Sequence, residues 1–99
     1  MTDKQFNDAF TVAGGWFILT QYEKIADWNG SRAELVDHIY SLGFDAERTG
    51  ANTRVSSVFR LIDENRIEEA IIKVRDSKRI NAKHPETFGI ASDILKRHF

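Results

Sequence analysis

Apolar residues recur at helical spacing along most of the chain. The clearest repeat is Val55, Val58, Phe59 and Ile62, which occupy positions i, i+3, i+4 and i+7 of one helix face. The same spacing, interrupted by glycine, asparagine and proline, predicts helices over these segments: 2–13, 16–28, 32–42, 53–64, 66–75 and 85–99. The opening of the second, 16–20, is also compatible with a short strand, but its few β-branched residues favour a helix. The pattern therefore predicts an all-α fold of five or six short helices.

Residues that cap helices mark several of the expected boundaries. Thr2 with Gln5, and Ser31 with Glu34, have the spacing of capping boxes. Gly43 is placed to end a helix in the left-handed region. Three further starts are expected at Asn52, Asn65 and Pro85. The polar segment 76–85 is then a connector, and residues 1–99 form a single compact domain.

The inward-facing positions of these helices give an expected core. It comprises Phe10, Leu19, Ile25, Leu35, Val36, Ile39, Phe44, Val58, Phe59, Ile62, Ile71 and Val74. The aromatic content, with two tryptophans near the ends of segment 16–28, exceeds what one small trihelical core can bury. An aromatic patch left at the surface would mark a protein interface.

In segment 19–42 the small and apolar residues have the spacing of two helices that pack closely across a short turn. Ala26 is small enough for two helices to cross closely, Gly30 allows a turn with positive φ, and Val36 and Ile39 point the next helix back toward the first. This spacing is similar to the helix-turn-helix of bacterial and phage DNA-binding regulators. The resemblance implies that the helix starting at Arg32 lies in the major groove. A trihelical packing unit needs the same residues, however.

The charges on that helix are unusual for a DNA reader. Glu34 and Asp37 place carboxylates on the face that would meet phosphates, and only Arg32 and His38 oppose them. The net charge of −1 also means that any nucleic-acid contact must come from a local basic patch. The absence of cysteine excludes disulfides and thiolate chemistry, and no segment resembles a signal peptide or membrane span, so we expect a cytoplasmic protein.

Two basic patches are candidates for binding phosphate. The first follows Glu47 and has no acidic residue before Asp63, so arginines and small hydroxyls gather near a helix start. The second is 73–83, which is the densest positive segment. The expected nucleic-acid-binding residues are Arg32, Arg48, Arg54, Ser57, Arg60, Lys78 and Arg79. The alternative is that these cations lie on solvated faces or pair with Glu47, Asp63 or Glu64.

The sequence gives little support for catalysis, a metal or a cofactor. The three histidines are scattered, the adjacent acidic pairs face different sides of a helix, and Gly14-Gly15 lacks the pattern of a phosphate loop. We therefore expect a non-enzymatic protein without metal or cofactor. Two functions stay open: a small helix-turn-helix-like nucleic-acid-binding or transcription-regulating protein, or a protein–protein interaction module of the same shape, in either case with homodimerisation possible. Arginines on one contiguous face favour the first; arginines dispersed into ion pairs favour the second.

Overall fold

A computed structural model describes all of residues 1–99 and contains seven helices and no strand. The helices are α1 Asp3–Ala13, α2 Gly15–Ala26, α3 Arg32–Ser41, α4 Arg48–Asp63, α5 Ile67–Arg75, α6 Lys78–Lys83 and α7 Thr87–His98. The all-α prediction is confirmed, but the expected number of five or six helices is wrong. The extra helix is α6, in the segment predicted to be a connector. Its start is capped by the Ser77 hydroxyl, which accepts from the amide of Ile80 at 3.2 Å, and the Ile80 side chain is buried.

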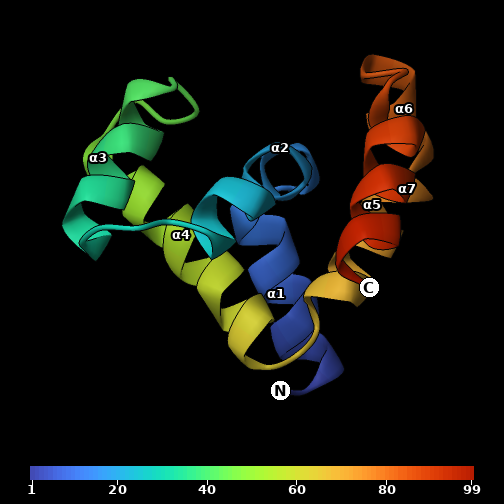
Figure 1. The fold of residues 1–99 in the computed structure, drawn as a ribbon, viewed down its shortest axis with the longest axis horizontal. Helices are drawn as coiled ribbons and strands as arrows, with labels where there is room; N and C mark the ends of the chain where they lie inside the picture. Colours follow the sequence, from blue (N-terminus) through green and yellow to red (C-terminus); the bar gives the residue numbers. More distant parts are fainter.

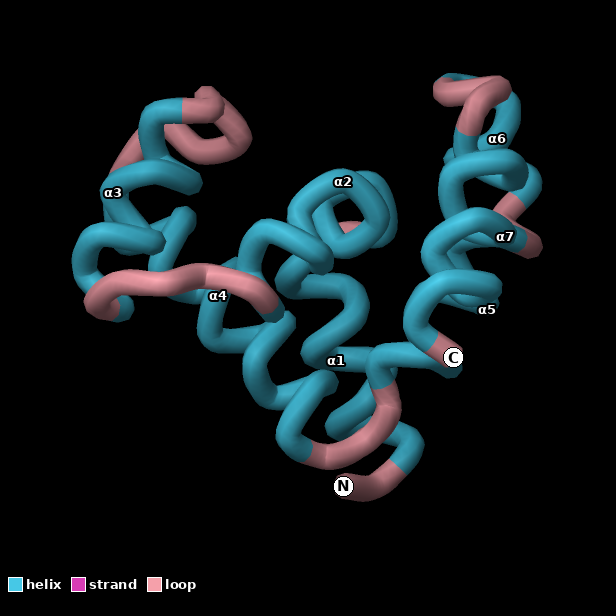
Figure 2. Tube along the Cα trace, viewed as in Figure 1, coloured by secondary structure: helices cyan, strands magenta, loops and turns pink.

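The helices form two groups joined by α2. Helix α1 packs along α4, and α3 packs on α4 as well, while α7 packs against both α5 and α6. Helix α2 contacts α1, α4, α5 and α7, and it lies between the two groups, where it is seen nearly end-on (Figure 1). The trace coloured by secondary structure shows that short loops make nearly every connection (Figure 2).

The core is one cluster of 22 buried apolar residues. The central helix α2 supplies Phe17, Ile18, Leu19, Tyr22 and Ile25, which cover more than one of its faces because α2 has neighbours on several sides. Most of the predicted core residues are buried. The exceptions lie at the edge of the core, where they are partly buried: Phe10, Phe44, Phe59 and Ile62.

Helix α4 shows why two of those predictions are wrong. It begins at Arg48 rather than after Asn52, and its buried residues are Ala51, Val55, Val58 and Leu61. The added first turn brings Ala51 into the inner stripe, and this stripe continues to Leu61 instead of passing through Phe59 and Ile62. The predicted face was therefore rotated relative to the real one.

The predicted helix ends are confirmed in part. The capping box of Thr2 and Gln5 is complete, with bonds of 2.9 and 3.1 Å. Gly43 has φ 84°, as expected. Ser31 accepts from the amide of Glu34, but the Glu34 carboxylate accepts from the Ser31 hydroxyl, so only half of that box forms. The starts predicted at Asn65 and Pro85 are wrong, since α5 begins after Arg66 and α7 after Glu86.

The close helix crossing expected within 19–42 is not present. Helix α3 packs mainly on α4, Ala26 is exposed, and Gly30 does not have a positive φ. The helix-turn-helix geometry depended on this crossing and turn, and of its expected features only the burial of Val36 and Ile39 is found. None of the seven helices combines the length and the apolar character needed to cross a membrane.

Candidate functional site

Arg48 is held by α3. Its Nε donates to Oδ1 of Asp37 at 2.6 Å, and its Nη2 donates to the carbonyl of Ala33 at 3.3 Å. These bonds tie the first turn of α4 to the helix that packs on it. Asp37, one of the two carboxylates expected to face DNA, is therefore paired with Arg48 within the molecule.

Arg54 is a tether between three parts of the chain. Its Nε donates to Oδ2 of Asp45 at 2.8 Å, and its Nη1 donates to the carbonyl of Ala13 at 2.6 Å. The guanidinium carbon also lies 5.6 Å from the ring centre of Phe17 and 5.9 Å from that of Phe44. Only 25% of the side chain is exposed. Arg54 is therefore turned toward α1 and the loop before α4 rather than toward open solvent.

Arg32 closes onto α4. Its Nη2 donates to the hydroxyl of Ser56 at 2.8 Å, and its guanidinium carbon lies 4.6 Å from the centre of the Phe59 ring. Ser57 is partly buried, while Arg60 is exposed and has no hydrogen-bond or ion-pair partner. The arginines of α3 and α4 therefore do not form one open basic face, and most of them are dispersed into internal bonds.

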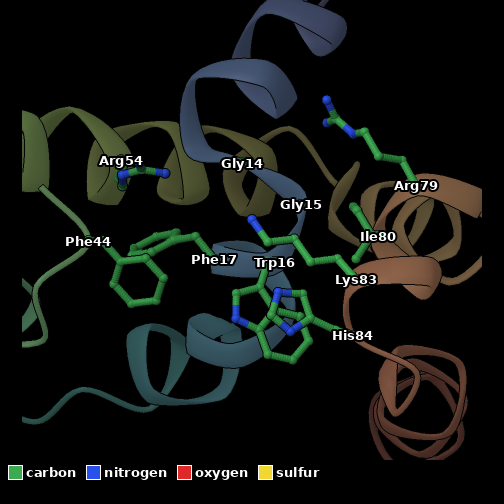
Figure 3. Close-up of a pocket in the computed structure, with 10 residues that line it drawn as sticks. All are labelled: Gly14, Gly15, Trp16, Phe17, Phe44, Arg54, Arg79, Ile80, Lys83 and His84. Atoms are coloured by element: carbon green, nitrogen blue, oxygen red, sulfur yellow. The ribbon is translucent and has the colours of Figure 1, made fainter.

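An open cleft lies between the start of α2 and helix α6 and has a volume of about 390 Å³ (Figure 3). It brings together segments that are far apart in the sequence. The lining residues are Gly14, Gly15, Trp16, Phe17, Phe44, Arg54, Arg79, Ile80, Lys83 and His84. In the view of Figure 3, the Lys83 side chain extends toward the start of α2. We name this feature the α2–α6 cleft.

The lining of the α2–α6 cleft is positive. It includes Arg54, Arg79, Lys83 and His84, and no carboxylate. The three other depressions on the molecule each include at least one aspartate or glutamate. Arg79 and Lys83 are exposed and make no ion pair, unlike Arg54. In a chain with 15 acidic and 14 basic residues, this separation of charge is local to the cleft.

Aromatic rings form the apolar part of the same cleft. The rings of Trp16 and His84 stack with centres 3.7 Å apart and planes 5° apart. Phe44 meets Phe17 edge-on, with ring centres 5.0 Å apart. The Trp16–His84 stack joins the first turn of α2 to the end of α6. The cleft thus combines unpaired positive charge with flat apolar surface.

Two glycines allow this arrangement. Gly14 has φ 87° and ψ 133°, a conformation that side chains with a Cβ rarely adopt. A Cβ on Gly15 would lie 2.5 Å from Cδ1 of Ile80, so the bare glycine lets α6 approach the start of α2. No side chain caps the first-turn amides of α2. These amides and the dipole of the helix add positive potential at the floor of the cleft.

Only part of this site could be predicted from the sequence. Arg54 and Arg79 were predicted to bind an anion, and the structure brings both to the cleft. Lys78 lies on the same short helix as Arg79 and is exposed, but it does not line the cleft. Lys83, His84 and Trp16 were missed as binding residues, although Lys83 belongs to the basic segment 73–83. No set of three or more histidine, aspartate or glutamate side chains is grouped to hold a metal ion.

Comparisons with known protein families, with curated proteins and with solved structures find no match for this chain.

Proposed function

We propose that the chain is a non-enzymatic interaction module that binds an anionic group of a partner protein in the α2–α6 cleft. This is the second of the two functions that the sequence leaves open, now given a site. The observation that carries the proposal is the charge of the cleft, where Arg79 and Lys83 are unpaired and no carboxylate is present. Charge-assisted bonds from such side chains to an anion are stronger than bonds between neutral groups.

The internal bonds of the other arginines argue against a duplex-binding surface. A protein that binds duplex DNA commonly neutralises several phosphates at once. Arg48 and Arg54 are each bonded to a carboxylate and to a carbonyl oxygen, so turning them toward DNA would break bonds that hold α3 and α1 on α4. A compact anionic group in the cleft needs no such rearrangement.

The lining of the cleft favours binding over catalysis. It contains no serine, threonine, cysteine, aspartate or glutamate, and His84 is its only histidine. The nearest carboxylate to His84 is that of Glu86, which lies 3.9 Å from Nδ1 and does not line the cleft, and no hydroxyl group lines the cleft.

A peptide-binding measurement tests the proposal. A fluorescein-labelled peptide rich in aspartate and glutamate is titrated with the protein at low salt, and its anisotropy is followed. We expect saturable binding that weakens at least about tenfold, or by about 1.4 kcal/mol, in the double variant Arg79→Gln with Lys83→Gln. The matched control, Arg60→Gln with Lys24→Gln, removes the same charge from exposed, unpaired side chains outside the cleft and should change the affinity less than about twofold. Equal weakening in both variants would contradict the proposed site.

A second candidate is the nucleic-acid-binding function predicted from the sequence. It is favoured by the combination of aromatic rings and unpaired cations in the cleft, which is typical of surfaces that bind single strands. A labelled single-stranded oligonucleotide and a duplex, used in the same titration, separate the candidates. Tighter binding of either nucleic acid than of the peptide, with a steep dependence on salt, would replace the first proposal.

A further inference from the structure

We infer that the α2–α6 cleft is specific for a phosphate monoester joined to a planar ring, either directly, as in an aryl phosphate, or through a short linker. The inference rests on the proposed function and goes further by naming the ligand class. A phosphotyrosine side chain of a partner protein carries the phosphate on the ring itself, and a free mononucleotide carries it on the ribose that bears the planar base. The observations that point to it are the unpaired cations and the aromatic walls of one cleft.

The charge of the cleft matches a phosphate better than a carboxylate. A phosphate monoester carries a charge of about −1.5 to −2 near neutral pH. Arg79 and Lys83 together supply two unpaired positive charges, while the guanidinium of Arg54 is already shared with Asp45. A single carboxylate would leave one of the two charges uncompensated.

The walls of the cleft match a flat ring. The partly buried rings of Phe44, Trp16 and His84 present faces and edges, whereas Phe17 is almost fully buried, and Ile80 adds a small aliphatic surface. The volume of about 390 Å³ lies in the range of small-ligand sites, so a ring and its phosphate fit together. An aromatic ligand gains from burial and from edge or offset contacts with these rings.

The position of the cations fixes the direction of the ligand. Both cations project from α6; in Figure 3 the Lys83 side chain extends toward the start of α2, whereas the Arg79 side chain runs away from the aromatic rings. The phosphate is therefore placed beside Lys83, between α6 and the first turn of α2, and the ring points toward the partly buried Phe44. The helix end adds to an anion site that the side chains already define.

Binding is tested with phenyl phosphate, inorganic phosphate and phenol as probes, by calorimetry and by the fluorescence of a Trp28→Phe variant, in which Trp16 of the cleft is the one remaining tryptophan. Phenyl phosphate should bind saturably and at least about tenfold more tightly than either fragment, because both halves of the cleft are then used. The double variant Arg79→Gln with Lys83→Gln should lose at least about tenfold in affinity, and Arg60→Gln with Lys24→Gln less than about twofold. Circular dichroism verifies that each variant is folded, and Lys83→Gln alone serves if the double variant is not.

Two further probes identify the source of the ligand. A short peptide with one phosphotyrosine and its unphosphorylated form test a protein partner, and adenosine monophosphate tests a free nucleotide. Tighter binding of the phosphopeptide supports a modified protein as the source. Tighter binding of the nucleotide supports the ligand class but overturns the partner protein of the proposed function.

Failure of the aryl phosphate inference can be distinguished from failure of the proposed function. If the acidic peptide and inorganic phosphate bind in the cleft as tightly as phenyl phosphate, the aryl phosphate inference is overturned and the proposed function stands. If no anion binds, both are overturned. Equal losses in the cleft variant and its control would show general charge screening and would also overturn the inference.

Discussion

Replacing Arg54 with glutamine should destabilise the fold far more than replacing an exposed cation. The shorter side chain cannot span from Asp45 to the carbonyl of Ala13, so bonds of 2.8 and 2.6 Å are lost together. Hydrogen bonds that involve a charged group contribute about 1.5–3 kcal/mol each. Because the Arg54 side chain is 25% exposed, part of this contribution is screened by water.

The groups left behind add to the cost. Asp45, whose side chain is 19% exposed, loses its cation, and the terminal carbonyl of α1 loses the donor that Arg54 supplies. We expect a loss of about 2–4 kcal/mol in the free energy of unfolding, below the simple sum of two charged bonds. A loss of this size is a large share of the stability of a small domain.

Denaturation in urea, followed by circular dichroism, measures this loss. Arg60→Gln is the matched control, since it makes the same substitution on the same helix at an exposed residue without a partner, and it should shift stability by less than about 0.5 kcal/mol. The double change Arg54→Gln with Asp45→Asn should be less destabilising than the sum of the single changes, because it leaves no unpaired carboxylate. A loss below about 0.5 kcal/mol for Arg54→Gln would refute the view that this arginine is a tether.

Three further predictions follow from the same structure. Gly14→Ala should cost about 1–3 kcal/mol in a denaturant titration, because alanine is strained at φ 87°, and an unchanged midpoint would contradict that backbone geometry. Leu61→Ala should lower the free energy of unfolding by about 2–5 kcal/mol, and Phe59→Ala should lower it clearly less. The reason is that Leu61 is fully buried, whereas Phe59 lies at the edge of the core. A larger loss for Phe59→Ala would support the helix face predicted from the sequence. Hydrogen bonds from His98 and Arg97 lower the pKa of Glu23. This carboxylate therefore contributes stability above its unfolded pKa that is lost as the pH falls through its folded pKa, and Glu23→Gln should weaken the loss of stability seen on acidification.

The helices could be predicted from the sequence because their signal is local. The spacing of apolar residues in 66–75 and the capping box of Thr2 each depend on neighbours within a few positions. Helix α6 was missed because six residues are too few to show a helical repeat, and only the capping hydroxyl of Ser77 marks it. The rotation of α4 was missed because apolar residues are present on two overlapping faces, and the packing of α1 and α3 decides between them.

The candidate site could be predicted only in fragments. Ion pairing of the arginines was an open alternative, but the partners expected were Glu47, Asp63 and Glu64, whereas the partners of Arg48 and Arg54 lie on α3 and in the loop that follows it. The cleft joins the start of α2 to α6, two segments separated by most of the chain. No local pattern reports such a contact, although a pair of glycines before a helix does mark a place where another element can approach closely.

The central claim, that the anion site is the α2–α6 cleft, is tested most directly by the backbone amide NMR spectrum of the labelled protein. Phenyl phosphate and a DNA duplex are each added in separate titrations. We expect phenyl phosphate to shift the amide signals of Gly15, Trp16, Phe17 and Lys83 along saturable curves, while the signals of α3 stay in place and the duplex has little effect. The opposite result would be shifts at Arg32–His38 of α3 on addition of duplex, with the cleft signals unchanged in both titrations. This result would contradict an anion site in the α2–α6 cleft and would support the helix-turn-helix prediction.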